Sequence, residues 1–185
     1  MKKSFDYFKT FKIITENLNS IYKLSVTSQD YSKQYFIFLA IKNEILDNLK
    51  NDFITPIERG DIFILSDIFS REICCISAIY EYSEFTWLEI EDIKLNIQKL
   101  LDFQEKIFQK MYFEKTNSNL INLCNDAYAL SLKLHKDMYK KIKNTVIGNC
   151  EKPLLRYSVY VNYLNFTEVL SNIFSETGRI ILNNS

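Results

Sequence analysis

The chain has 185 residues and a mass of 22.0 kDa, which suits one sizeable domain, and its 47% of hydrophobic residues exclude an intrinsically disordered protein. Its 23 basic and 23 acidic residues give a formal net charge of zero, so no overall basic field favours nucleic acid as a partner. No uncharged apolar run approaches the roughly 20 residues that span a bilayer, and the first residues do not resemble a signal peptide, so we expect one cytoplasmic domain over residues 1–185.

Helices are the expected secondary structure along the whole chain. Only three Gly and two Pro residues interrupt it, and the segments between them repeat apolar residues every three or four positions. Helices of this length with short connections should pack as antiparallel neighbours. The fold class is therefore predicted as all-α, a bundle of six long antiparallel helices compatible with two three-helix halves. The spacing places the helices near 4–26, 29–51, 55–82, 85–114, 118–145 and from Pro153 onward.

The third predicted helix has the most clearly marked start, within the sequence NDFITPIERGDIFILSDIF at residues 51–69. Thr55 can accept a hydrogen bond as the N-cap, Pro56 fits the first helical position, and Glu58 completes a capping box. Capping explains these three residues but not Arg59 or Asp61. Two explanations remain for Arg59 and Asp61: they are structural, or they are presented to a partner.

The fifth predicted helix carries a group of cations toward its end, and Gly148 and Pro153 mark where it stops and the next helix begins. The negative end of the helix dipole is a sufficient reason for such cations. A second explanation is peripheral contact with the anionic inner face of a membrane, or with an acidic partner. The single histidine, His135, lies among them and is expected to be exposed. The cations are Lys133, Lys136, Lys140, Lys141 and Lys143.

The sequence contains no enzyme signature. It lacks the glycine-rich loops that bind phosphates, the paired histidines of zinc proteases and the nucleophile elbow of hydrolases. Its carboxylate pairs cannot be told apart from solvated helix faces. The four cysteines show no C-x-x-C spacing, which indicates reduced, buried thiols. We therefore predict no catalytic residue and no cofactor.

Residues 53–67 resemble the hallmark of the PhoU-like phosphate-uptake regulators, in the branch that accompanies low-affinity Pit-type phosphate transporters. That branch carries a Phe-Ile-Thr-Pro segment, an acidic-Arg pair and an Asp-Ile step at the start of its third helix. The resemblance implies an all-α fold of two three-helix halves, and a regulator of inorganic phosphate transport. The matching residues are Phe53, Ile54, Thr55, Pro56, Glu58, Arg59, Asp61, Ile62 and Asp67.

The chain departs from that family where metal ligands are expected. Family members usually bind metal clusters through acidic residues at i, i+4 spacing, because such cations need several converging carboxylate oxygens. Here Ile37 and Leu39 stand at those positions in the second helix, Ile68 and Arg71 in the third, and Tyr128 in the fifth. Counting ligands in this way predicts no multinuclear metal site.

The leading functional hypothesis is a non-enzymatic accessory protein or regulator that docks on a Pit-type inorganic phosphate transporter, with Arg59, Asp61 and Asp67 as partner-binding residues. The alternative is a diverged helical scaffold or self-association module, since abundant Tyr and Phe suit an oligomer interface as well as a core. A third hypothesis is a metal-dependent enzyme or metal-binding regulator on the same bundle.

Overall fold

The computed structural model describes residues 5–52, 54–83, 90–114, 118–148 and 152–184, and these residues form helices and connections without any strand. Within them six helices follow one another along the chain, which confirms the prediction of an all-α fold of six helices. They are α1 (Tyr7–Ser25), α2 (Ser32–Asn51), α3 (Arg59–Tyr80), α4 (Glu91–Glu114), α5 (Ser118–Ile147) and α6 (Pro153–Asn183).

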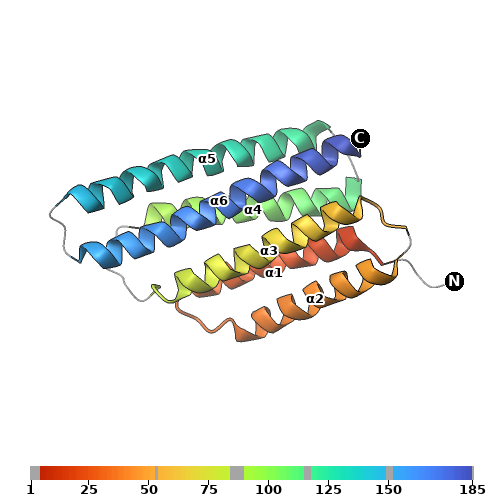
Figure 1. The fold of residues 1–185 in the computed structure, drawn as a ribbon, viewed down its shortest axis with the longest axis horizontal. Helices are drawn as coiled ribbons and strands as arrows, with labels where there is room; N and C mark the ends of the chain where they lie inside the picture. The colour runs from red at the N-terminus through yellow and green to blue at the C-terminus, as the bar shows by residue number, and fades with distance from the viewer. Residues whose placement is uncertain (1–4, 53, 84–89, 115–117, 149–151, 185) are drawn as a thin grey trace.

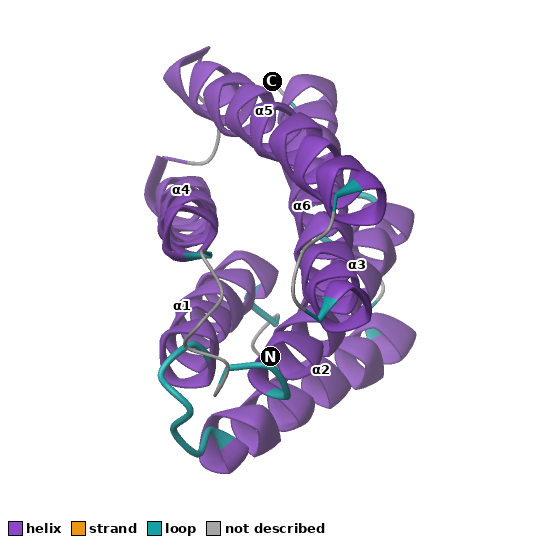
Figure 2. Ribbon diagram, turned by 90° about the vertical axis from the view of Figure 1, so that its left-hand side faces the viewer, coloured by secondary structure: helices purple, strands orange, loops and turns teal. Residues whose placement is uncertain are grey.

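The helices are arranged as two three-helix halves that pack against each other. Helices α1, α2 and α3 contact one another, as do α4, α5 and α6, while α1 packs on α4 and α3 packs on α6 to join the halves. The end-on view in Figure 2 shows α2 on the outside of one half and α5 on the outside of the other. The predicted pair of three-helix halves is thus the arrangement seen.

One apolar cluster runs through both halves. Its centre includes three completely buried phenylalanine rings, Phe11 of α1, Phe69 of α3 and Phe108 of α4, whose centroids are 5.5–6.0 Å apart. Rings at these separations and tilts attract one another beyond the area they bury. Tyr22 of α1 and Phe166 of α6 make a further contact at 5.9 Å. The two halves therefore share one core.

The predicted boundaries agree with most helix ends. The fifth helix ends at Ile147, immediately before Gly148, and Pro153 lies in the first turn of α6, as expected from the stop and restart signals. The expected start of the fourth helix, near residue 85, lies outside the described residues, as does Phe53.

The predicted start of the third helix is wrong. Helix α3 begins at Arg59, with Glu58 as an N-cap that makes no side-chain capping hydrogen bond. The Thr55 hydroxyl instead donates to the Ile57 carbonyl at 2.7 Å, which closes a turn before the helix and excludes the proposed N-cap role. Pro56 also lies in this turn. Burial of Ile57, which is 5% exposed, holds the turn against the core, so tertiary packing overrides the local capping pattern.

A buried polar pair connects α3 and α4 inside the bundle. Glu72 is 0% exposed, and the Gln104 side-chain amide donates to its Oε2 atom at 2.9 Å. The Oε1 atoms of both residues are buried acceptors without a donor. A proton on the carboxyl group would supply the donor that this pair lacks. Consistently, burial raises the pKa of Glu72 to about 8, although the bond from Gln104 lowers it.

The two longest helices, α5 with 30 residues and α6 with 31, extend past the other four at one end of the bundle (Figure 1). The start of α1 and the end of α6 lie at the opposite end. Among the described residues, no helix has the length and apolar character needed to cross a bilayer.

Candidate functional site

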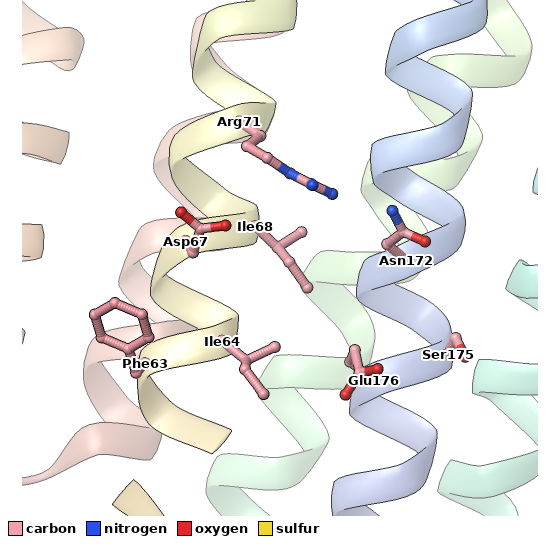
Figure 3. A pocket seen from close by; sticks show the side chains of 8 residues that line it. All are labelled: Phe63, Ile64, Asp67, Ile68, Arg71, Asn172, Ser175 and Glu176. Atoms are coloured by element: carbon pink, nitrogen blue, oxygen red, sulfur yellow. The ribbon is translucent and has the colours of Figure 1, made fainter. Parts of the chain in front are cut away.

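A groove between α3 and α6 includes three exposed residues of the segment that resembles the transporter accessory proteins, Phe63, Ile64 and Asp67. It consists of two adjoining hollows of about 300 and 450 Å³, and Arg71 lines both of them. We call these together the α3/α6 groove. The first hollow, drawn in Figure 3, is lined by Phe63, Ile64, Asp67, Ile68, Arg71, Asn172, Ser175 and Glu176. The second adds Ser70, Cys74, Cys75, Asn165, Glu168 and Val169.

An ion-pair network fixes α3 to α6 at one end of this groove. Arg179 of α6 donates from its Nη2 atom to the Asp61 carboxylate at 2.5 Å and from Nε to Glu176 at 2.8 Å. These bonds raise the pKa of Arg179 above its ordinary value. Asp61 itself is 3% exposed, so its side chain offers almost no surface to a partner. Asp61 is therefore bonded within the molecule, and its side chain is not accessible to a partner.

Arg59 also has an intramolecular bond, although its side chain is exposed. Its guanidinium donates to the Leu49 carbonyl, one of the carbonyls at the end of α2 that have no partner within the helix. A cation at this position also suits the negative end of the α2 dipole. Arg59 therefore caps α2 and links it to the start of α3.

Asp67 is the one residue of the three predicted for partner binding that stands open in the groove. Both Asp67 and Arg71, one helical turn later, are exposed. Figure 3 shows Arg71 extending from α3 toward Asn172 of α6, with Ile64 and Ile68 below it on the side facing α6. Phe63 points to the other side of α3 and is 59% exposed, and Ile64 is 37% exposed. Ile64, Asp67 and Arg71 are thus exposed residues of α3 that line this hollow, while Ile68 is 5% exposed.

Neither the Cys75 thiol nor the histidine provides an activated nucleophile or base in this groove. Burial raises the pKa of the Cys75 thiol to about 12, which keeps it protonated and a poor nucleophile at neutral pH. His135, the single imidazole, lies elsewhere, with Nδ1 at 3.2 Å from the Thr167 hydroxyl between α5 and α6. It is partly buried, so the expectation that it is exposed is wrong.

No three His, Cys, Asp or Glu side chains converge as metal ligands anywhere in the described ranges. In the α3/α6 groove, the carboxylates of Asp67 and Glu176 share the surface with the guanidinium of Arg71. A fixed cation among carboxylates disfavours a second cation there. The groove is therefore better matched to a partner with both positive and negative groups than to a single cation.

Two features of the site were missed by reasoning from the sequence. The first is Arg179, whose partner lies 118 residues away, so no local pattern could reveal the pair. The second is the exposure of Phe63 and Ile64. A signal for it exists, because residues 62–65 are four consecutive apolar residues and a helix with one buried stripe cannot cover all four.

Comparison with protein-family models and with curated proteins finds no match to this chain. The resemblance of residues 53–67 to the PhoU-like regulators therefore stays a prediction about family.

Proposed function

We propose that this protein is a non-enzymatic accessory protein or regulator of low-affinity inorganic phosphate transport, and that it docks on a Pit-type transporter through the α3/α6 groove. The observation that carries the proposal is the position of Phe63, Ile64 and Asp67. All three lie within the segment that resembles the family, are exposed and line the groove, whereas other exposed residues of that segment, such as Ile54 and Arg59, lie outside the groove.

The groove has the features of a site for an amphipathic helix. Such sites combine apolar anchors with flanking charges, and two parallel walls of α-helix provide the usual groove. Ile64 offers exposed apolar surface on the side of α3 that faces α6, while Asp67 and Arg71 offer opposite charges one turn apart. The expected partner segment is a helix or loop at the inner face of the transporter with apolar residues and both signs of charge.

A charge-swapped pair of substitutions tests this docking. The variant Asp67→Lys with Arg71→Glu reverses both charges, keeps the net charge, and changes only exposed side chains. The matched control, Glu44→Lys with Lys106→Glu, makes the same exchange on exposed positions of α2 and α4.

Tagged protein would be used to capture partners from gently solubilised membranes, with identification by mass spectrometry. We expect capture of a phosphate transporter by the unaltered protein and by the control, and loss of that capture by the groove variant. Equal capture by the groove variant would refute docking at this groove. Failure of the folded, unaltered protein to retain any phosphate transporter would refute the transport role itself.

A second candidate function, a self-association module, is favoured by the outer face of α2. Phe36 is 68% exposed and Ile37 is 40% exposed on this peripheral helix. Exposed large apolar side chains of this kind often mark interfaces between copies. Sedimentation of the unaltered protein and of a Phe36→Ser, Ile37→Ser variant tests it, since a dimer that becomes monomeric in the variant would establish this interface.

A further inference from the structure

The end of the α5–α6 hairpin is an isolated projection of the bundle. We define the α5–α6 tip as residues 136–148 and 152–157. In Figure 1 it extends beyond α1, α2, α3 and α4, at the end opposite to the start of α1 and the end of α6. Its position lets it meet a flat surface before the other helices do.

Aliphatic side chains are exposed at this tip where a water-facing helix end would carry polar ones. Val146 and Ile147 at the end of α5 are 67% and 74% exposed, and Leu154 at the start of α6 is 82% exposed. Two tyrosines stand behind them, Tyr139 at 64% and Tyr157 at 43% exposed. Aliphatic side chains at a projecting end with tyrosines set back from it form the order found at a lipid interface.

Positive charge gathers on the same hairpin although the whole chain is neutral. Residues 133–157 contain seven Lys or Arg and only two acidic residues. Lys136, Lys140 and Lys143 are exposed, and of these Lys140 has Asp137 at 3.4 Å as an ion-pair partner. Lys141 turns toward the ring of Tyr160 at 6.0 Å. Exposed cations thus precede the apolar end along α5.

We propose that the α5–α6 tip binds an anionic lipid surface, with Val146, Ile147 and Leu154 entering the interface and the lysines contacting lipid headgroups. The combination favours lipid over other partners. A nucleic acid would use the cations but leave the aliphatic side chains in water. A second copy of the tip would cover the aliphatic side chains but bring like charges together. An anionic lipid surface satisfies both groups at once.

The proposal does not depend on the transport role, because it needs only lipid. Sedimentation with vesicles tests it, using the full chain and vesicles of phosphatidylcholine alone or with phosphatidylglycerol, at low and high salt.

The charge variant is Lys136→Glu with Lys143→Glu, and its control is Lys99→Glu with Lys106→Glu on exposed positions of α4. The apolar variant is Ile147→Ser with Leu154→Ser, and its control is Leu182→Ser, which is 60% exposed at the other end of α6. Circular dichroism checks that every variant is folded.

We expect binding to the anionic vesicles that weakens with salt, and little binding to phosphatidylcholine. Each cation near an anionic surface raises partitioning about fivefold, so loss of the two lysines alone should weaken binding about 25-fold, and repulsion of the two new glutamates should weaken it further. The apolar variant should also bind more weakly, and both controls should bind like the unaltered protein.

Several results would overturn the proposal. Absence of binding to anionic vesicles would do so directly. Equal binding to both vesicle types, or equal losses in the controls, would show that the tip is not the determinant. Loss in the charge variant with full binding in the apolar variant would mark a general polyanion surface and exclude insertion into lipid.

Discussion

Replacement of Glu72 by glutamine should change how the free energy of unfolding depends on pH. Glu72 is completely buried, and burial raises its pKa from 4.5 to about 8. Below about pH 4.5 the carboxyl is neutral in the folded and the unfolded chain alike. As pH rises, the unfolded chain ionises first and is favoured, while the folded chain keeps its proton until about pH 8. The stabilisation is therefore complete at low pH and is lost as pH rises through this window.

The size of the effect follows from the two pKa values. Each pH unit between them is worth about 1.4 kcal/mol, so the folded state loses about 5 kcal/mol between pH 4.5 and about 8, and about 3 kcal/mol of that by neutral pH. A glutamine side chain at this position would have nearly the same shape and no ionisation, and its amide would replace the carboxyl proton as the donor. We expect Glu72→Gln to match the unaltered protein near pH 4.5 and to exceed its stability by several kcal/mol near pH 8.

Urea unfolding followed by far-UV circular dichroism, repeated across this pH range, measures the effect. The difference between the two proteins isolates Glu72, because all other titrating groups are common to both. Glu44→Gln on the exposed surface of α2 serves as the control and should leave the pH dependence unchanged. Parallel curves for Glu72→Gln and the unaltered protein would refute the reasoning, since they would show that Glu72 ionises equally in both states.

The remaining predictions concern single positions. Arg179→Gln should lower the free energy of unfolding by about 2 kcal/mol, less than for a fully buried pair because Arg179 is partly exposed, as measured by urea unfolding. Gly60→Ala should raise the melting temperature, because alanine favours a helix and no atom lies within 4 Å of the added Cβ. The expected gain in the free energy of unfolding is about 0.5–1 kcal/mol. Gly148→Ala should lower stability in the same assay by about 1 kcal/mol, because its Cβ would lie 2.8 Å from a backbone oxygen. Cys74, which is exposed, should react with a thiol reagent about tenfold faster than Cys75, as read by tandem mass spectrometry of the labelled protein.

The fold could be predicted because its signal is local. Apolar residues at three-and-four spacing identify one face of each helix, and the few Gly and Pro residues mark some of the helix ends. The predicted stop at Gly148 and restart at Pro153 are confirmed for the same reason. The capping box at Thr55 was a local signal as well, but it fails because burial of Ile57 and the turn before α3 depend on the rest of the bundle.

The candidate site could be predicted only in part, because its organisation depends on pairs that are distant in sequence. The pairing of Asp61 with Arg179 and the buried contact of Glu72 with Gln104 involve residues 118 and 32 positions apart. Nothing in the local sequence distinguishes such buried charges from exposed ones. Local sequence alone therefore does not reveal that Arg59 and Asp61, two of the residues predicted to bind a partner, make intramolecular bonds.

These intramolecular bonds change where a partner should be sought on α3. Arg59 and Asp61 hold α3 against α2 and α6, so their replacement would disturb the fold and any docking together. The accessible residues Phe63, Ile64 and Asp67 have no comparable role in the core. Four consecutive apolar residues on one helix place some of them in water whatever the packing, and here the exposed ones lie beside a row of charges. A partner that covers this row would explain both the apolar exposure and the charges, which neither capping nor core packing does.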